Sequence, residues 1–514
     1  MTRSINSTKL GRWFFVAPLG CVMGVMFSCS PAGRDGSVVN NGTAAAAATA
    51  ATPGTGGTAA GGAPATGGTR ALPNLGGTLH SDHMGMGQCE NLECAVPTCA
   101  PGTTTSISGK VFAPNGTLPL YNVAVFVPNQ PVEAFKDGAS CDRCGANITN
   151  PVTATLTDET GSFKLEGAPA GTDIPLVIQV GKWRRQLTIP AVTACVDTPL
   201  TDPQMTRLPK NKTEGDIPKI AITAGAADQM ECLLPRLGIA DTEFTASTGE
   251  GRIHLYTGDY GNRNNDPLPV MKMDAAHGGA ALTAANTLWD ASENLMKYDI
   301  VILSCEGDSY AQRKPMASRT ALYDYASKGG RVFASHWHNV WFAQGPNPVP
   351  TTGTWENRTN PTADNGAATA AINTTFPKGA ALAKWLLNVG ASTMEGQMTV
   401  TFPRDNIQAV NPDVAREWIT VQNSRVRAGQ DPKAVQYMSF NTPIGVPEEQ
   451  VCGRAVYTDL HVAAVDNNTV ANANGFPASC EMRELSAQEK AVAFMLFDLS
   501  SCVQNEDRPP PIPK

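Results

Sequence analysis

The sequence is short of several features that would assign a class of protein at once. After Cys29 it has no apolar run long enough to cross a bilayer as a helix, which argues against a protein with several membrane spans. It has no cluster of Lys or Arg, and its net charge is −7, which argues against nucleic acid as a partner. Residues 31–77 carry almost no large apolar side chains, so this stretch has nothing with which to build a core.

The first residues have the pattern of an export signal. A basic start over residues 1–12 precedes an apolar run over residues 13–27, which is too short to span a bilayer comfortably. The run ends in Met26-Phe27-Ser28-Cys29, which resembles a bacterial lipoprotein cleavage site with Cys29 as the lipidated residue. An ordinary signal peptide with a chance Cys, or a retained membrane helix, is the alternative.

The Gly-, Ala-, Thr- and Pro-rich stretch that follows is typical of a flexible tether. We therefore expect residues 1–28 to be a lipoprotein signal peptide and residues 29–78 to be a tether. The implied partner is a membrane, reached through the lipid anchor. The expected location is the cell envelope, either periplasmic or surface-exposed.

The chain has thirteen cysteines, of which Cys21 and Cys29 lie in or at the end of the signal. The remaining eleven would be exported into an oxidising compartment, where most should pair, and an odd number predicts at least one thiol without a disulfide. Cys305 could pair with Cys232 or simply be buried, and a third interpretation is a thiolate nucleophile activated near His336.

Two cysteine groups allow more than one interpretation. Cys89, Cys94 and Cys99 lie near His80 and His83, but the CxxC spacing of a zinc site is missing, so residues 79–105 are predicted to be a disulfide-stapled lead-in. The CxxC pair at 141–144 could be a redox pair, half of a metal site, or two halves of structural disulfides. Its position in a loop between strands favours structural disulfides, with Cys195 as one candidate partner.

Residues 106–197 contain short alternating or β-branched segments separated by Pro, Gly and Asn, which predicts an all-β sandwich. Three motifs, ISGKV at 107–111, PLYNV at 119–123 and TDETGSF at 157–163, resemble the carboxypeptidase regulatory-like, transthyretin-type sandwich. The resemblance implies a non-catalytic module with a structural or adhesive role.

After a linker over residues 198–216, strands alternate with helical segments over residues 217–503, and residues 504–514 form a tail. A helix from Ala280 to Met296 leads into a strand at 298–304, and a helix at about 316–328 leads into a strand at 331–334. This order predicts an α/β open sheet of flavodoxin-like type. The predicted fold class is therefore multi-domain, a β-sandwich followed by that sheet.

Polar side chains gather where the strand at 331–334 should end, in the sequence GGRVFASHWH at 329–338. Ligands of open parallel sheets bind outside the carboxyl ends of the strands, so Ser335, Trp337 and the two histidines there are candidate site residues. His461 is expected to end another strand of the same sheet.

The sequence YDIVILSCEGD at 298–308, followed by a helix and by GGRVFASHWH, is similar to the class I glutamine amidotransferase-like superfamily. His336 occupies the position of that family's elbow Cys, so glutaminase activity is not implied. A His at the elbow, and the late stretch from Gly453 to His461, resemble the trehalose-utilisation (ThuA-like) branch. In the superfamily the region around Cys305 contributes backbone amides that stabilise an oxyanion.

The candidate site residues fall into three groups that share several members. His336 and His461 are candidate general bases, and His336, His338 and His461 could hold a divalent metal together with Glu306, Asp459 or Cys305. The alternative is that these imidazoles are structural, hydrogen-bonded at the sheet edge. The candidate ligand-binding residues are Cys305, Glu306, Gly307, Ser335, Trp337 and His338.

Three functions compete at this point. The first is a lipoprotein whose degenerate amidotransferase-like part binds a ligand, such as a carbohydrate, without covalent chemistry. The second is a hydrolase or isomerase of a sugar derivative that uses His336 or His461, with a divalent metal as its candidate cofactor. The third is an adhesive or scaffold protein of the cell envelope.

Overall fold

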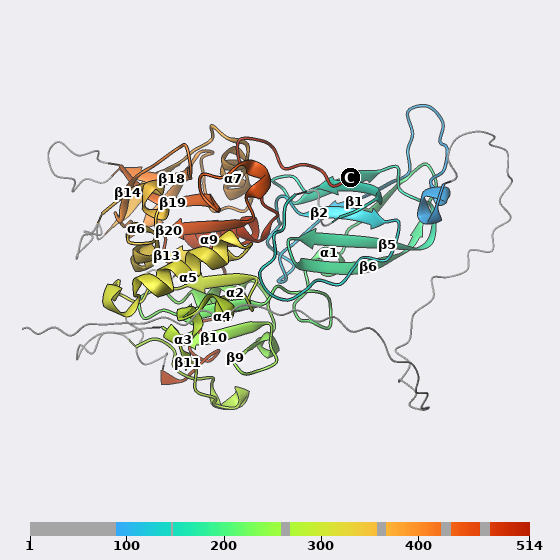
Figure 1. Ribbon diagram of the computed structural model, residues 1–514. Helices are drawn as coiled ribbons and strands as arrows, with labels where there is room; N and C mark the ends of the chain where they lie inside the picture. Colours follow the sequence, from blue (N-terminus) through green and yellow to red (C-terminus); the bar gives the residue numbers. More distant parts are fainter. Residues whose placement is uncertain (1–88, 145–147, 259–267, 357–365, 423–432, 463–472) are drawn as a thin grey trace, which may run out of the picture. The chain divides into compact units, whose positions relative to one another are not determined.

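A computed structural model describes residues 89–144, 148–258, 268–356, 366–422, 433–462 and 473–514 of the chain (Figure 1). The protein is multi-domain, as predicted, and contains several sheets together with helices. The proposed lipidation site Cys29, the tether, His80 and His83 lie outside the described residues. Within those ranges, no helix has the length and apolar character needed to cross a membrane.

Two sheets make up the strand-rich part. Successive side chains of a strand point to opposite faces of its sheet, so buried apolar residues can alternate with exposed polar ones. In Ser162–Glu166, for example, Phe163 and Leu165 are buried whereas Lys164 and Glu166 are exposed. A four-stranded sheet has the order β3 (Pro151–Leu156), β2 (Ala124–Pro128), β5 (Gly171–Val180), β6 (Trp183–Val192). A three-stranded sheet has the order β4 (Ser162–Glu166), β1 (Ser106–Lys110), β7 (Asp197–Leu200).

The mixed part is built on an 11-stranded sheet. Its centre consists of parallel strands in the order β10 (Ile253–Thr257), β8 (Ile220–Ala224), β12 (Ile300–Leu303), β13 (Arg331–Ser335), β20 (Gly453–Thr458). The sheet continues antiparallel through β19 (Lys433–Thr442), β18 (Arg416–Gln422), β15 (Ala367–Ile372) and β16 (Gln397–Thr401). On the other edge, β11 (Thr283–Ala284) and β9 (Phe244–Ala246) pair with β10.

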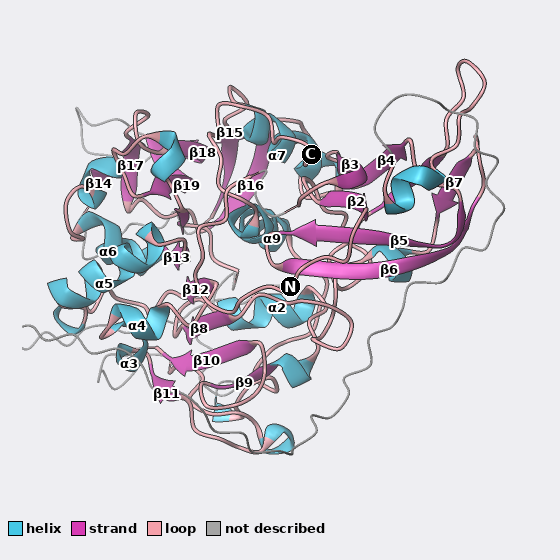
Figure 2. Cartoon of the chain, turned by 45° about the vertical axis from the view of Figure 1, so that its right-hand side comes forward, coloured by secondary structure: helices cyan, strands magenta, loops and turns pink. Residues whose placement is uncertain are grey.

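The central strands are buried on both faces because helices cover each side. In β12, Ile302 packs in the same cluster as the apolar residues of α9 (Ala487–Ser500), and Leu303 packs in the cluster of α5 (Met316–Ser327). Figure 2 shows α5 and α9 on either side of β12 and β13. The remaining short elements include α1 (Pro203–Thr206), α2 (Leu233–Arg236), α6 (Val340–Ala343), α7 (Pro377–Asn388), β14 (Gly353–Trp355) and β17 (Ile407–Val410).

The helix predicted at about 316–328 is found as α5, but the predicted helix from Ala280 to Met296 is wrong. That stretch contains β11 and two short helices, α3 (Asn286–Trp289) and α4 (Ser292–Leu295). The N–H of Ala285 donates to the carbonyl of Thr257, and Ala291 has extended backbone. Pairing with β10 therefore overrides the local helical preference.

Five disulfides link ten of the eleven cysteines expected in the exported body, and Cys305 is the buried thiol left over, as the odd count predicts. The CxxC pair forms two structural disulfides, as favoured, but not with Cys195. Cys232 does not pair with Cys305 either. The pairs are Cys89–Cys94, Cys99–Cys195, Cys141–Cys452, Cys144–Cys502 and Cys232–Cys480.

Helix α9 connects the strand-rich part to the large sheet. The ring of Phe494 stacks on Tyr121, with centroids 5.9 Å apart, and both parts contribute side chains to one apolar cluster. Gly181, in the turn between β5 and β6, has φ +53°, and a Cβ there would collide with the carbonyl oxygen of Ser500. Because Gly181 has no side chain, the turn can lie against the end of α9.

Candidate functional site

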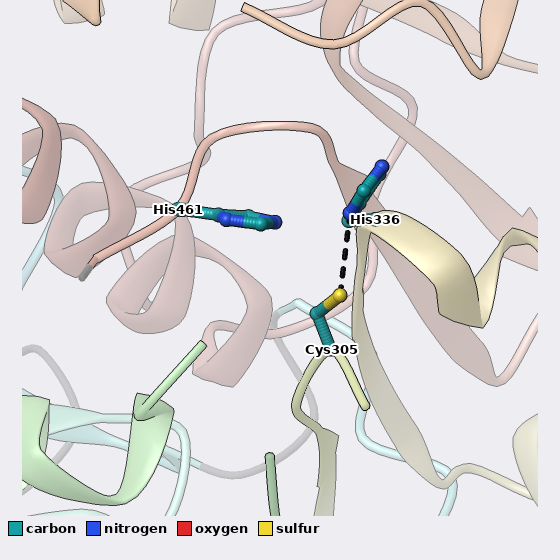
Figure 3. Close-up of side chains that lie close together, drawn as sticks. All are labelled: Cys305, His336 and His461. Atoms are coloured by element: carbon teal, nitrogen blue, oxygen red, sulfur yellow. Dashed lines mark hydrogen bonds between the residues drawn. The ribbon is translucent and has the colours of Figure 1, made fainter. Parts of the chain in front are cut away.

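Three side chains meet where adjacent parallel strands end. Cys305 follows β12, His336 follows β13 directly, and His461 follows β20. Because β12, β13 and β20 are neighbours and run parallel, their carboxyl ends lie at one edge of the sheet. Figure 3 shows the thiol of Cys305 and the ring of His461 directed toward His336.

The backbone turns sharply at His336. Its φ is +42°, in the left-handed region that is uncommon for a residue with a side chain, and a 3-10 turn over His336–Asn339 follows at once. The hydroxyl of Tyr457 lies 2.8 Å from the carbonyl oxygen of His336. The elbow therefore sends His336 and His338 in different directions, although residues two apart on a regular strand would face the same way.

His338 does not join the other two histidines. Its Nε2 donates to the carbonyl of Ser304 (2.8 Å), and its Nδ1 accepts a hydrogen bond from Nε1 of Trp341 (2.7 Å). The ring is fully buried, and burial together with the charge of Lys314 holds the pKa of His338 well below its usual value. In the predicted metal set of His336, His338 and His461, Cys305 takes the place of His338.

Cys305, His336 and His461 form a compact group. Sγ of Cys305 lies 3.2 Å from Nδ1 of His336, and the ring centroids of His336 and His461 are 4.9 Å apart. One donor atom from each residue lies within 4.8 Å of the other two. Among the described residues, Nε2 of His336 and Nε2 of His461 have no hydrogen-bond partner although both atoms are buried.

All three groups are held in their neutral forms. Burial lowers the pKa of His336 well below its usual value, and the neighbouring imidazole of His461 and the charge of Arg404 act in the same direction. Burial, then the charge of Arg404, lowers the pKa of His461 to about 3. Burial raises the pKa of Cys305 to about 12, although the backbone amides of Trp337 and Gly307 act in the opposite direction. Cys305 and His336 therefore face each other as a neutral thiol and a neutral imidazole, without charge separation.

Tyr457 and Asp459 support the elbow from β20 and the loop after it. The single hydroxyl proton of Tyr457 is shared between two contacts, the carbonyl oxygen of His336 (2.8 Å) and Oδ1 of Asp459 (2.6 Å). Burial raises the pKa of Asp459 to about 7. A protonated Asp459 can donate to Tyr457 while Tyr457 donates to His336, so the network is satisfied with one extra proton.

The other predicted ligand-binding residues have varied roles. The carboxylate of Glu306 pairs with Lys314 (2.6 Å), and both side chains are buried. Oγ of Ser335 accepts a hydrogen bond from the N–H of Cys305 (2.9 Å). Gly307 has φ +88°, and Trp337 is half-buried with its ring centroid 5.1 Å from that of His336. Ser335 and Glu306 therefore brace the loop, whereas Trp337 can face a ligand.

The segment from Arg404 to Asn406 belongs to the site but was not predicted from the sequence. The N–H of Asn406 donates to Oδ2 of Asp459 (3.1 Å), and the side chain of Asn406 favours the charged form of His336. No strand pattern or motif marks these residues, because they lie in the loop between β16 and β17 and reach the site only through tertiary contacts.

Two further histidines, His254 and His277, lie away from the site. Nδ1 of His254 lies 2.8 Å from the hydroxyl of Tyr298, and its Nε2 lies 3.1 Å from the carbonyl oxygen of Gly249. His277 pairs with Asp274 through Nδ1 (2.7 Å). Both have local partners that account for their positions.

The donor set of Cys305, His336 and His461 fits a metal ion of borderline or soft character. Thiolate and imidazole suit zinc and copper, with ligand bonds of about 2.0–2.3 Å for zinc. Donor atoms within 4.8 Å of one another can surround one such ion. A metal would also give a partner to an imidazole nitrogen that otherwise has none, and it would displace the proton of the thiol.

The comparisons with known proteins assign no family. No family model and no curated protein matches the chain. Among solved structures, a putative ThuA-like protein from Bacteroides uniformis is 12% identical over 52% of this chain and 93% of its own, with a TM-score of 0.25. The cytoplasmic protein STM3548 from Salmonella typhimurium is 9% identical over 42% of this chain and 80% of its own, with a TM-score of 0.26.

A third similar structure is a cohesin–X-dockerin complex from Acetivibrio cellulolyticus. It is 17% identical over 28% of this chain and 78% of its own, with a TM-score of 0.14. Similarities of this size carry no conclusion about activity, so the function has to be argued from the residues of the site.

Proposed function

We propose that this chain is an exported protein of the cell envelope that binds a ligand at the edge formed by β12, β13 and β20, without a covalent step. The ligand that the geometry supports best is a transition-metal ion such as zinc. One observation carries the proposal: Cys305, His336 and His461 bring their donor atoms within 4.8 Å of one another.

The protonation states favour metal binding over nucleophilic catalysis. A thiol becomes a strong nucleophile when its pKa is lowered, whereas burial raises the pKa of Cys305 to about 12. The neutral imidazoles of His336 and His461, by contrast, are already in the form that binds a metal. We therefore propose no amidotransferase activity for Cys305.

A metal-assisted hydrolase or isomerase acting on a sugar derivative is the second candidate. It is favoured by the number of donors, because three protein ligands leave one position of a tetrahedral ion for water. Trp337 is half-buried beside His336 and offers an aromatic face on which a sugar ring could stack. In this candidate His336 and His461 hold the metal and do not act as bases.

The remaining parts of the proposal concern location and fold. The disulfides point to an oxidising, extracytoplasmic compartment, which agrees with export. The lipid anchor at Cys29 is proposed from the residues around that cysteine alone. The two sheets between residues 106 and 200 support a carboxypeptidase regulatory-like sandwich. The parallel order β10-β8-β12-β13-β20, which is 2-1-3-4-5 in order along the chain, supports a flavodoxin-like sheet. A scaffold role remains the third candidate.

Metal content of the purified full chain tests the proposal. We expect stoichiometric zinc after exposure to zinc and gel filtration, and we expect Cys305→Ser, His461→Ala and His336→Asn to lose it. Asn is chosen for position 336 because it tolerates a positive φ. The matched control is His277→Ala, which removes an imidazole paired with Asp274 outside the site and should keep the metal.

Cobalt provides a second readout. A Co²⁺-loaded chain should show a thiolate-to-cobalt charge-transfer band that is missing in Cys305→Ser. Wild-type chain without metal, or full metal content in the folded Cys305→Ser variant, would contradict the proposal.

A further inference from the structure

Arg404 lies beside the Cys305, His336 and His461 group because the loop after β16 is fastened to the loop after β20. The side chain of Gln488, in α9, accepts a hydrogen bond from the N–H of Thr401 (2.6 Å) and donates to the carbonyl of His461 (3.0 Å). The next strand, β17, begins three residues after Arg404, so this loop has little freedom to move away.

A second glutamine fixes Arg404 itself. The side chain of Gln436 donates to the carbonyl of Arg404 (2.7 Å), and the backbone carbonyl of Gln436 accepts a hydrogen bond from the N–H of Asp459 (2.9 Å). Gln436 is fully buried in β19. The backbone of Arg404 is therefore held at a set distance from the loop that carries His461.

The guanidinium of Arg404 has no hydrogen bond or ion pair among the described residues, and its Nε is buried without a partner. The carboxylate of Asp459 does not pair with it, because Oδ1 contacts Tyr457 and Oδ2 accepts from the N–H of Asn406. An arginine is always charged, and burying part of it without a partner costs free energy. A site that holds such a group open is suited to an anion.

The charge of Arg404 is close enough to act on the groups of the site. It is the second cause of the lowered pKa of His461, and it also lowers the pKa values of His336 and Cys305. It also acts on Asp459, where it lowers the pKa against the effect of burial. Its neighbours in the Cys305, His336 and His461 group are the neutral imidazoles and the neutral thiol. Nothing in this trio offsets the positive charge.

We infer that the site takes a small molecule with an anionic oxygen group, a carboxylate or a phosphate, which Arg404 binds next to Cys305, His336 and His461. The inference rests on the proposed function, because a metal held by one thiolate and two neutral imidazoles adds a further positive charge beside Arg404. The planar guanidinium matches either group with two parallel hydrogen bonds. Trp337 would then contact the remainder of the molecule.

Thermal unfolding of the purified full chain in the presence of inorganic phosphate or acetate tests this inference, with chloride used to hold the ionic strength constant. We expect one of the two anions to raise the midpoint in a saturable manner. The dissociation constant for that anion should rise about tenfold or more in Arg404→Gln, which is the range expected for the loss of a charged hydrogen-bonded pair. Phosphate and acetate together decide which group is preferred.

Two further variants keep the test decisive. Arg404→Lys retains the charge and should restore part of the affinity, which a merely misfolded loop would not do. Arg508→Gln removes an arginine whose side chain is 68% exposed and that pairs with Glu448, and it should bind as the wild type does. Equal dissociation constants for wild type and Arg404→Gln, or no saturable effect of either anion on the wild type, would overturn the inference.

Zinc content measured on the same samples separates this inference from the proposed function. Zinc without an Arg404-dependent anion effect would sink the anion site and leave the metal site standing. An Arg404-dependent effect of the anion in a chain that binds no zinc would support the anion site and overturn the proposed metal site.

Discussion

The three histidines near the strand ends differ in what surrounds their nitrogens. His338 uses both nitrogens in hydrogen bonds within the protein, whereas His336 and His461 each leave a buried Nε2 without a partner among the described residues. A buried polar atom without a partner lowers stability, and a bound ligand would supply the partner that these two atoms lack. His338 is therefore structural, and the other two are available to bind.

This difference predicts that the two substitutions lower stability by unequal amounts. His338→Ala leaves Nε1 of Trp341 and the carbonyl of Ser304 without partners and should lower the free energy of unfolding by roughly 2–5 kcal/mol. His461→Ala should cost about 1 kcal/mol or less, because no hydrogen bond of its Nε2 is lost. Urea unfolding of the metal-free chains measures both. A larger loss for His461→Ala than for His338→Ala would contradict this assignment.

Glu231, in the 3-10 turn Met230–Cys232, should make stability depend on pH. Burial, with the nearby charge of Asp228, raises its pKa to about 8 from the ordinary value of 4.5. The folded chain thus holds a proton that the unfolded chain releases. Stability from this group is fully present below pH 4.5 and is lost as pH rises toward 8.

We therefore expect the free energy of unfolding to fall by roughly 1.4 kcal/mol for each pH unit within that window. Glu231→Gln keeps the shape without the proton equilibrium and should flatten the profile. Urea unfolding at about pH 5, 6 and 7 provides the measurement. A parallel slope in wild type and Glu231→Gln would show that another group is responsible.

At the scale of elements, the sequence predicted best where local pattern and tertiary context agree. The strands β12, β13 and β20 are apolar runs that are buried on both faces, so their residues alone indicate their positions. The stretch at 280–296 is helical by pattern, but pairing of Thr283 with Tyr256 imposes a strand at its start. The loop carrying Arg404 has no pattern at all, so its part in the site could not be predicted.

Helix α9 begins with a capping box that also anchors the helix to its surroundings. Oγ of Ser486 accepts from the N–H of Glu489 (3.2 Å), and the carboxylate of Glu489 accepts from the N–H of Ser486 (2.7 Å). Glu489 is buried and forms ion pairs with Arg236 and Arg483. The next residue toward the N-terminus, Gln488, is the one that binds the carbonyl of His461.

Two substitutions separate the cap from the ion pairs. Ser486→Ala should cost about 1 kcal/mol, the usual value for a lost N-cap. Glu489→Ala should cost about 3 kcal/mol or more, because it also leaves the buried guanidinium of Arg236 without its carboxylate. Urea unfolding measures each change. Equal costs would mean that the two arginines contribute nothing to the stability of α9.

At the scale of the whole molecule, the sequence predicted a strand-rich part and a mixed part but not how they join. The ring pair Tyr121–Phe494 and the hydrogen bond from Nε1 of Trp385 to the carbonyl of Pro119 (2.9 Å) connect residues hundreds of positions apart. Local periodicity carries no information about such contacts. The same limit applied to the disulfides, whose connectivity cannot be read from spacing.

The two disulfides of the CxxC segment close nearly the same loop. Cys141–Cys452 spans 311 residues and Cys144–Cys502 spans 358 residues. Both disulfides link the loop at 141–144, in the strand-rich part, to the mixed part. When one is removed, the other still restricts the unfolded chain. Their contributions to stability should therefore be strongly non-additive.

We expect Cys141→Ser with Cys452→Ser to lower the free energy of unfolding by less than about 2 kcal/mol, and removal of both disulfides to lower it by about 4 kcal/mol or more. Cys89–Cys94, which closes a loop with a separation of only 5 residues, is the matched control and should matter least. Urea unfolding followed by tryptophan fluorescence and by circular dichroism measures all three. Because one apolar cluster spans both parts, the two signals should change together even without these disulfides. Separate transitions would mean that the disulfides, rather than the packing around α9, hold the two parts together.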